Sequence, residues 1–214
     1  MGFSLLARRA YQSIYDIEPA ALAERGIRLL LADLDNTLVP YGVAEPTERV
    51  RAWERELKAS GVTLFILSNN RHQDRARRFA EALGVPFIGH AGKPKPMSFY
   101  AAMEEMGCTR AQTAIVGDQI FTDILGGSNA GVETLLVEPI RLAGNPGRYL
   151  RDAVEWPFRI IAKRRSRRLC AQRLDQPEIP TAFLLFTDLL WTRPSGFRIS
   201  DWIVMSISVV RAFI

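Results

Sequence analysis

Short apolar runs alternate with amphipathic stretches along the first 140 residues of the chain. Apolar runs bounded by polar or glycine residues predict buried strands, and there are five of them: 29–32, 62–67, 85–88, 113–116 and 134–137. Between these runs, apolar residues recur at helical spacing and predict helices at about 46–60, 71–83, 97–106 and 119–130. Strands that alternate with helices favour a parallel sheet covered on both faces. We therefore predict a three-layer α/β fold with a five-stranded parallel sheet.

The N-terminal residues 4–26 form a lead-in to this pattern. Its apolar side chains could share one helical face, and a short helix at 20–25 would precede Gly26; the four apolar residues are Leu5, Leu6, Ile14 and Ile17. With this lead-in, the first predicted domain covers residues 1–147. Residues 148–168 form a basic amphipathic segment, which Pro157 should divide into two shorter helices because proline lacks the N–H that a helix interior needs. Residues 169–214 are a C-terminal extension whose structure the pattern does not predict.

Charge is concentrated in the middle one of these three segments. The chain carries a net charge of +5, yet residues 148–168 alone hold eight basic and two acidic residues. Hydrophobic content of 48% and charged content of 24% are typical of a globular protein. His72 and His90 have no partner at metal-ligand spacing, which excludes a usual zinc site. No apolar run reaches the roughly 18 residues of a spanning helix.

Polar residues with catalytic potential follow the predicted strands. They are Asp33 and Asp35 after the first strand, Ser68 after the second, Lys93 after the third and Asp118 after the fourth. Right-handed crossovers bring the carboxyl ends of such strands to one edge of the sheet. Neighbouring carboxylates repel each other unless a cation lies between them, and Mg²⁺ suits an oxygen-lined site that also holds phosphate. The pattern predicts a site for a metal ion and a phosphoryl group.

Four sequence motifs now stand in order, each after its own strand. They are Asp-Leu-Asp-Asn-Thr-Leu from 33, Leu-Ser-Asn-Asn from 67, Lys-Pro at 93, and Gly-Asp-Gln-Ile-Phe-Thr-Asp from 117. This set, spanning about residues 26–140, resembles the haloacid dehalogenase superfamily. The Ser-Asn-Asn form, the last motif and the glycine pair at 126–127 resemble the YqeG-like phosphatases, a family that includes phosphatidylglycerophosphate phosphatases.

The resemblance implies a role for each motif residue. Asp33 would be the nucleophile that forms an aspartyl-phosphate, and Asp35 the general acid and base. Lys93 would neutralise developing charge, although Lys95 is an alternative. Phosphate would be held by Ser68, Asn69 and Thr37, of which Thr37 would also support the loop and Asp35. Mg²⁺ would be held by Asp33, Asp118 and the Asp35 carbonyl, with Asp123 orienting this shell.

Simpler interpretations stay open for several of these residues. Ser68 is also a candidate helix cap, and Asn69 and Asn70 are common turn formers. Asp123 could serve only as an acidic residue near a helix N-terminus, where the helix dipole favours negative charge. Both histidines are expected at the surface or in loops.

The spacing between motifs bears on the substrate. Members of the superfamily usually carry an inserted cap domain, but neither the interval 35–68 nor the interval 68–93 has room for one. An open site suits a large substrate such as a lipid head group, a protein or a nucleic-acid end. From the resemblance we expect phosphatidylglycerophosphate, which would be converted to phosphatidylglycerol.

The basic segment suggests partners but does not decide between them. Its cations and aromatic residues fit an anionic membrane surface, whereas a solvated helix packed on the domain is an equally good interpretation. Nucleic acid is a less favoured partner, since its phosphates attract the same cations. We expect a cytoplasmic protein, peripheral at the inner membrane face if the lipid interpretation holds. The alternatives are a phosphatase acting on a soluble metabolite, phosphoprotein or nucleic-acid end, and a binding module in ribosome assembly.

Overall fold

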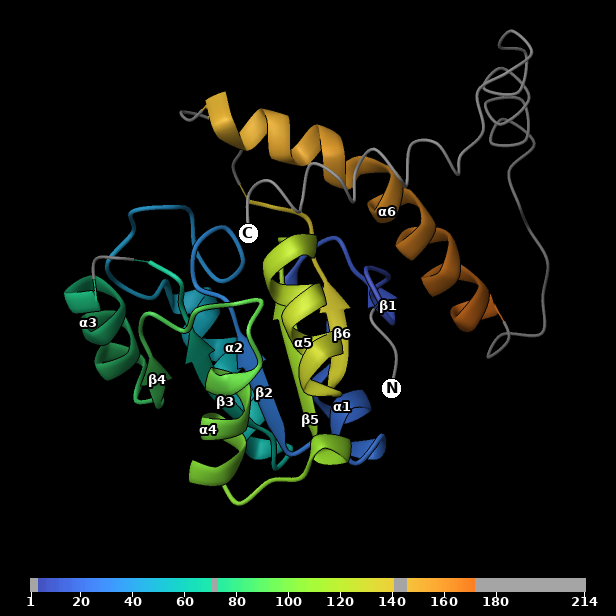
Figure 1. Ribbon diagram of the computed structural model, residues 1–214. Helices are drawn as coiled ribbons and strands as arrows, with labels where there is room; N and C mark the ends of the chain where they lie inside the picture. Colours follow the sequence, from blue (N-terminus) through green and yellow to red (C-terminus); the bar gives the residue numbers. More distant parts are fainter. Residues whose placement is uncertain (1–3, 71–72, 141–145, 172–214) are drawn as a thin grey trace, which may run out of the picture. The chain divides into compact units, whose positions relative to one another are not determined.

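The computed structural model describes residues 4–70, 73–140 and 146–171, and residues 1–166 form one compact unit. Its centre is a parallel sheet of six strands in the order β1-β6-β5-β2-β3-β4 (Figure 1). The strands are β1 (Arg9–Ala10), β2 (Leu29–Ala32), β3 (Thr63–Leu67), β4 (Phe87–Ile88), β5 (Thr113–Gly117) and β6 (Glu133–Leu136). The α/β class and the parallel sheet are confirmed, but the count of five strands is wrong.

The additional strand, β1, lies in the segment that we expected to be helical. It pairs with β6 through backbone hydrogen bonds, from Arg8 N to Thr134 O at 3.0 Å and from Tyr11 N to Leu136 O at 2.9 Å. A strand of two residues is too short to show an alternating side-chain pattern, so the sequence carried no sign of it. The apolar residues around it serve different clusters: Leu5 packs beside α6, whereas Ile14 packs in the core with α1 and α2.

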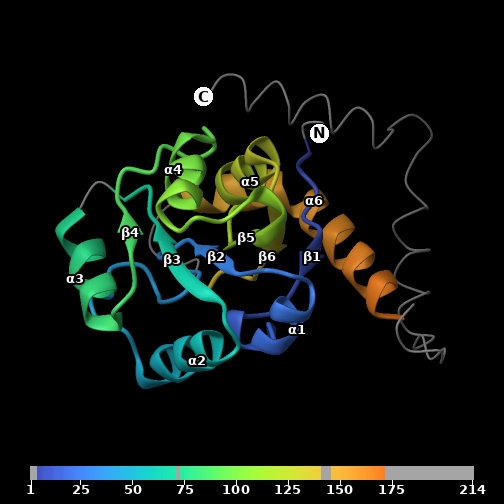
Figure 2. The same cartoon turned by 90° about the horizontal axis from the view of Figure 1, so that it is seen from below.

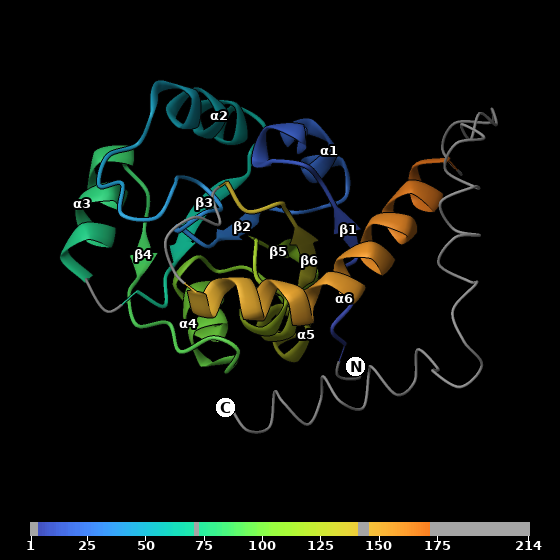
Figure 3. The same cartoon turned by 90° about the horizontal axis from the view of Figure 1, so that it is seen from above.

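Helices cover both faces of the sheet (Figures 2 and 3). One face packs against α1 (Pro19–Glu24), α2 (Glu48–Ala59) and α3 (Gln73–Leu83), and the other against α4 (Met97–Glu105) and α5 (Leu125–Ala130). Short helical turns are η1 (Ile14–Asp16), η2 (Arg110–Gln112) and the π-helical η3 (Ile120–Ile124). Within β2, Leu30 packs in the apolar cluster on the face covered by α1, α2 and α3, and Leu31 packs in the cluster on the face covered by α4 and α5. Every residue of β2 is buried, which is why the strand reads as a continuous apolar run.

The last described element is α6, a single helix from Pro146 to Ala171 with Pro157 inside it. The prediction of two shorter helices is wrong. The helix instead bends about midway along its length (Figures 1 and 3), as proline-containing helices do. Phe158 and Ala162 are buried against Ile120 and Leu136, and this packing offsets the lost hydrogen bond. The predicted extension at 169–214 lies almost wholly outside the described residues.

The intervals that follow β2 and β3 each hold a single helix. In the described part of the chain, the interval between β2 and β3 holds one loop and α2, and the interval between β3 and β4 holds α3. No cap domain is present among these residues, as predicted. Among the described helices, none combines the length and the apolar character needed to cross a bilayer.

Candidate active site

The predicted residues meet at the carboxyl-terminal edge of the sheet. Asp33 follows β2, Ser68 follows β3, and Asp118 follows β5, while Lys93 lies in the loop between β4 and α4. These four residues, together with Asp35, Thr37 and Asp123, are all buried. These residues lie close together because β2 pairs in parallel with β3 on one side and β5 on the other, so the carboxyl ends of the three strands are neighbours.

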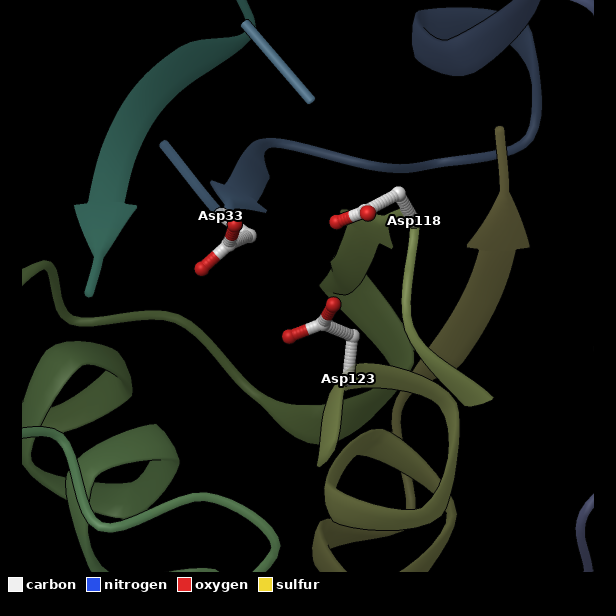
Figure 4. Close-up of side chains that lie close together, drawn as sticks. All are labelled: Asp33, Asp118 and Asp123. Atoms are coloured by element: carbon white, nitrogen blue, oxygen red, sulfur yellow. The ribbon is translucent and has the colours of Figure 1, made fainter. Parts of the chain in front are cut away.

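Three carboxylates form the centre of the site. Asp33, Asp118 and Asp123 each contribute an oxygen, and these oxygens all lie within 4.8 Å of one another. Figure 4 shows the three side chains converging from the ends of β2 and β5 and from the turn that follows β5. Three buried acids at this separation repel each other strongly if all are ionised.

Among the described residues, Lys93 is the basic side chain that lies between these acids. Its Nζ lies 2.7 Å from Asp33 Oδ1 and 2.7 Å from Asp123 Oδ1, and it donates to the Leu67 carbonyl at 2.7 Å. Burial alone would lower the pKa of Lys93, but Asp123 and Asp33 outweigh burial and hold the pKa above its ordinary value. Lys93 therefore stays charged. Lys95, the alternative, is exposed.

The charge on Asp33 is poorly compensated in the protein alone. Burial raises the pKa of Asp33 to about 6; the Lys93 ammonium opposes this rise and the Asp123 carboxylate adds to it. Asp33 Oδ2 is buried, and no described residue donates a hydrogen bond to it. An orphaned carboxylate oxygen beside two further carboxylates is a donor set that a hard divalent cation such as Mg²⁺ fits.

Asp35 lies beside this cluster with a different partner. Its carboxylate accepts from Arg75 Nη2 at 2.5 and 2.6 Å and from Asn70 Nδ2 at 2.8 Å. Arg75 also donates to the Val43 carbonyl at 2.6 Å. Sequence reasoning missed Arg75, because it is one of several arginines on a charged helix, and treated Asn70 only as a turn former.

The remaining predicted residues connect the loops of the site. The Thr37 hydroxyl donates to Asp118 Oδ1 at 3.1 Å and accepts from the Asp118 N–H at 3.0 Å. It supports Asp118, whereas we had expected it to support Asp35. The Asn69 side chain exchanges two hydrogen bonds with the Lys93 backbone, both at 2.9 Å, so it fixes the lysine loop. Ser68 Oγ accepts from the Asn70 N–H at 3.1 Å, a hydrogen bond within the turn that precedes α3.

The glycine pair at 126–127 has a packing role on α5. A Cβ on Gly126 would lie 2.9 Å from the Phe99 ring, and one on Gly127 would lie 2.4 Å from Ile115 Cγ2. Both glycines therefore allow α5 to approach α4 and the sheet closely.

Known phosphatases are similar in sequence to part of this chain. A family model described as HAD-hydrolase-like, where HAD stands for haloacid dehalogenase, matches residues 90–139. The probable phosphatase YqeG of Bacillus subtilis is 39% identical over 129 residues, covering 60% of this chain and 74% of YqeG.

Two photosynthetic organisms supply further relatives. Phosphatidylglycerophosphate phosphatase 1 of Chlamydomonas reinhardtii (chloroplastic) is 31% identical, and the match covers 66% of this chain and 55% of the relative. The Arabidopsis thaliana enzyme of that name (chloroplastic/mitochondrial) is 30% identical, with 61% and 40% covered. The identity to YqeG extends over about three quarters of that protein's length. The chain belongs to the YqeG-like phosphatase family of the haloacid dehalogenase superfamily.

Proposed function

We propose that the protein is a Mg²⁺-dependent phosphomonoesterase that works through an aspartyl-phosphate and acts on phosphatidylglycerophosphate. The observation that carries the reaction is the state of the Asp33 carboxylate. One oxygen is tied to Lys93, and the other is buried without a described donor. Asp33 Oδ2 is therefore available to a metal ion, and Asp33 Oδ1 is left to react with phosphorus.

In the first half-reaction, a carboxylate oxygen of Asp33 attacks phosphorus in line with the leaving oxygen. The bond from phosphorus to the leaving oxygen breaks, and that oxygen takes a proton from Asp35. Lys93 stabilises the negative charge that develops on the phosphoryl oxygens. The product on the enzyme is an acyl phosphate at Asp33, and the dephosphorylated alcohol leaves.

In the second half-reaction, water attacks the same phosphorus atom. Asp35, now ionised, takes the water proton, and the bond from phosphorus to Asp33 breaks to release inorganic phosphate. Arg75 and Asn70 hold the Asp35 carboxylate in place through the contacts given above. Asp35 is thus oriented to serve both half-reactions.

Asp33, Asp118, Asp123 and the Asp35 carbonyl would hold the Mg²⁺ ion. When bound there, Mg²⁺ supplies charge neutralisation and orientation of the phosphoryl group. Asp123 also keeps Lys93 beside Asp33, since its carboxylate and that of Asp33 share the same ammonium. The candidate phosphate-binding groups are the Ser68 hydroxyl and the backbone around Asn69.

The lipid substrate is supported by the relatives named phosphatidylglycerophosphate phosphatase and by the absence of a cap domain among the described residues. The basic segment gives weaker support than its composition suggests, because Arg159 is buried and Lys163 forms an ion pair with Glu138 at 3.1 Å. Arg164 and Arg165 remain exposed, and Trp156 is 54% exposed on the same helix. These groups would suit peripheral contact with an anionic membrane.

Phosphate release tests the proposal. Wild type, Asp33→Asn and Asp74→Asn are assayed with Mg²⁺ on phosphatidylglycerophosphate in mixed micelles and on para-nitrophenyl phosphate. Asp74 is the matched control, because its carboxylate is largely exposed and pairs only with Arg77 among the described residues. Lipid turnover by wild type and Asp74→Asn, lost in Asp33→Asn, supports the whole proposal.

Other outcomes separate its parts. Turnover of the soluble ester alone would keep the mechanism and exclude the lipid, pointing to a soluble metabolite, phosphoprotein or nucleic-acid end. Activity that survives in Asp33→Asn would exclude the aspartyl-phosphate.

A further inference from the structure

The turn of α6 that contains Glu155 and Arg159 contacts the loop of residues 118–123, which supplies Asp118 and Asp123 to the site. Both residues are charged and buried, with exposures of 1% and 6%. They belong to the basic segment 148–168, whose composition predicts a surface exposed to solvent or to a membrane. Burying two charges is costly unless both are paired and hydrogen-bonded, so their contacts indicate what they do.

Arg159 joins the backbones at the ends of two strands. Its Nη2 donates to the carbonyl of Asp118 and lies 3.1 Å from Glu155 Oε2, and its Nη1 donates to the carbonyl of Val137 at 3.4 Å. Asp118 directly follows β5, and Val137 directly follows β6. The guanidinium therefore fixes the main chain of a carboxylate that belongs to the proposed metal site.

Glu155 holds the other half of the same loop. Its Oε1 accepts from the Phe121 N–H at 3.3 Å, at the start of the turn η3 that carries Asp123. Next to it on α6, the Phe158 ring packs edge-on against Phe121, with centroids 6.2 Å apart. Burial raises the pKa of Glu155, and the Arg159 guanidinium opposes that rise.

We propose that Glu155 and Arg159 are positioning residues that hold Asp118 and Asp123 in the geometry that binds Mg²⁺. This inference rests on the proposed function for the presence of the metal. It makes α6 a structural part of the active site, although the helix lies outside the segment 26–140 that carries the catalytic motifs. A general packing role would not require contacts to the six-residue loop that supplies two of the three carboxylates.

Magnesium titration by isothermal calorimetry tests the inference on the full chain without substrate. The variants are Arg159→Met, Arg159→Lys and, as the matched control, Lys163→Met. Lys163 lies one turn further along α6 and pairs with Glu138, as Arg159 Nη1 does at 3.9 Å, but among the described contacts of Lys163 none reaches the 118–123 loop. Groups that support a metal ligand change affinity by about 10- to 100-fold when they are removed.

We expect the Kd for Mg²⁺ to rise about tenfold or more in Arg159→Met, less in Arg159→Lys, which keeps a donor and a charge, and not in Lys163→Met. Glu155→Gln, which keeps the side-chain volume, should raise the Kd by a few-fold and provides the test if Arg159→Met does not fold. An unchanged Kd in folded Arg159→Met and Glu155→Gln, even with a lowered melting temperature, would overturn this inference but leave the proposed function intact. Absence of Mg²⁺ binding by wild type would overturn the metal site of the proposed function as well.

Discussion

A methyl group added at Gly117 should disable the site without changing any of its polar groups. Gly117 is the last residue of β5, and a Cβ built there would lie 2.3 Å from Asp123 Cγ and Oδ2 and 2.4 Å from its Cβ. Favourable carbon contacts begin at about 3.5 Å. Asp123 is fully buried, so it cannot swing into solvent to avoid this methyl group.

The displacement required sets the size of the effect. To relieve the overlap, Asp123 must move by roughly 1 Å, the difference between these distances and a normal contact. That movement breaks its 2.7 Å ion pair with Lys93 and its 3.1 Å hydrogen bond from the Gln119 N–H. A 1 Å misplacement of a catalytic constellation costs about 100-fold in rate, and overpacking costs about 1–3 kcal/mol in stability.

Gly127→Ala is the matched control for Gly117→Ala. Its Cβ would lie 2.4 Å from Ile115 Cγ2 and 2.8 Å from Thr134 Cγ2, so it overpacks the helix–sheet interface and touches no carboxylate. We expect similar losses of stability in urea unfolding, but a loss of kcat/KM of about 100-fold only in Gly117→Ala. Equal kcat/KM and equal Mg²⁺ affinity in the two folded variants would refute the reasoning that Asp123 must hold its position.

Three further predictions concern the charges of the site. Burial raises the pKa of Asp33 in the folded protein to about 6, against an ordinary value of 3.8. The stability that protonated Asp33 contributes to the metal-free protein is therefore fully present below the ordinary value and is lost as pH rises through about 6. Asp33→Asn should remove this dependence, which amounts to at most about 3 kcal/mol; equal pH profiles of unfolding free energy in the two proteins would contradict it. Lys93→Met leaves two buried carboxylates unpaired and should destabilise the metal-free protein by about 3–5 kcal/mol, with partial recovery in Mg²⁺; a loss of less than about 1 kcal/mol in urea unfolding would argue against the shared ion pair. Arg75→Gln removes one of the two groups that hold the Asp35 carboxylate and should lower kcat by about tenfold at unchanged Mg²⁺ affinity. Arg77→Gln, which alters an exposed pair, should leave kcat unchanged, and equal rates in these two variants would refute the role of Arg75.

Much of the site could be placed from the sequence because its residues follow strands directly. Asp33, Ser68 and Asp118 each come immediately after an apolar run, and parallel connection puts those positions at one edge. Asp123 lies only five residues beyond Asp118, so its proximity is largely local. The resemblance assigned the role to Lys93 with Lys95 as an alternative, and the structure places Lys93 among the acids.

The partners of these residues could not be predicted in the same way. Arg75 and Arg159 are each one of several arginines on their helices. Which of them faces the site depends on how the helix is rotated and docked, and neither composition nor periodicity specifies that for a charged face. The pairing of Thr37 with Asp118, 81 positions apart, depends likewise on the register between β2 and β5.

The sequence by itself determined the α/β class, the chain order of the strands that end in polar motifs, and the set of acids and lysine in those motifs. These features follow from local apolar runs and from the fixed handedness of parallel connections. Only the tertiary structure decided the sixth strand, the continuity of α6 through Pro157 and the burial of Glu155 and Arg159. Each of these depends on backbone pairing or packing between segments distant along the chain, where the gain from contacts outweighs the local preference of the residues.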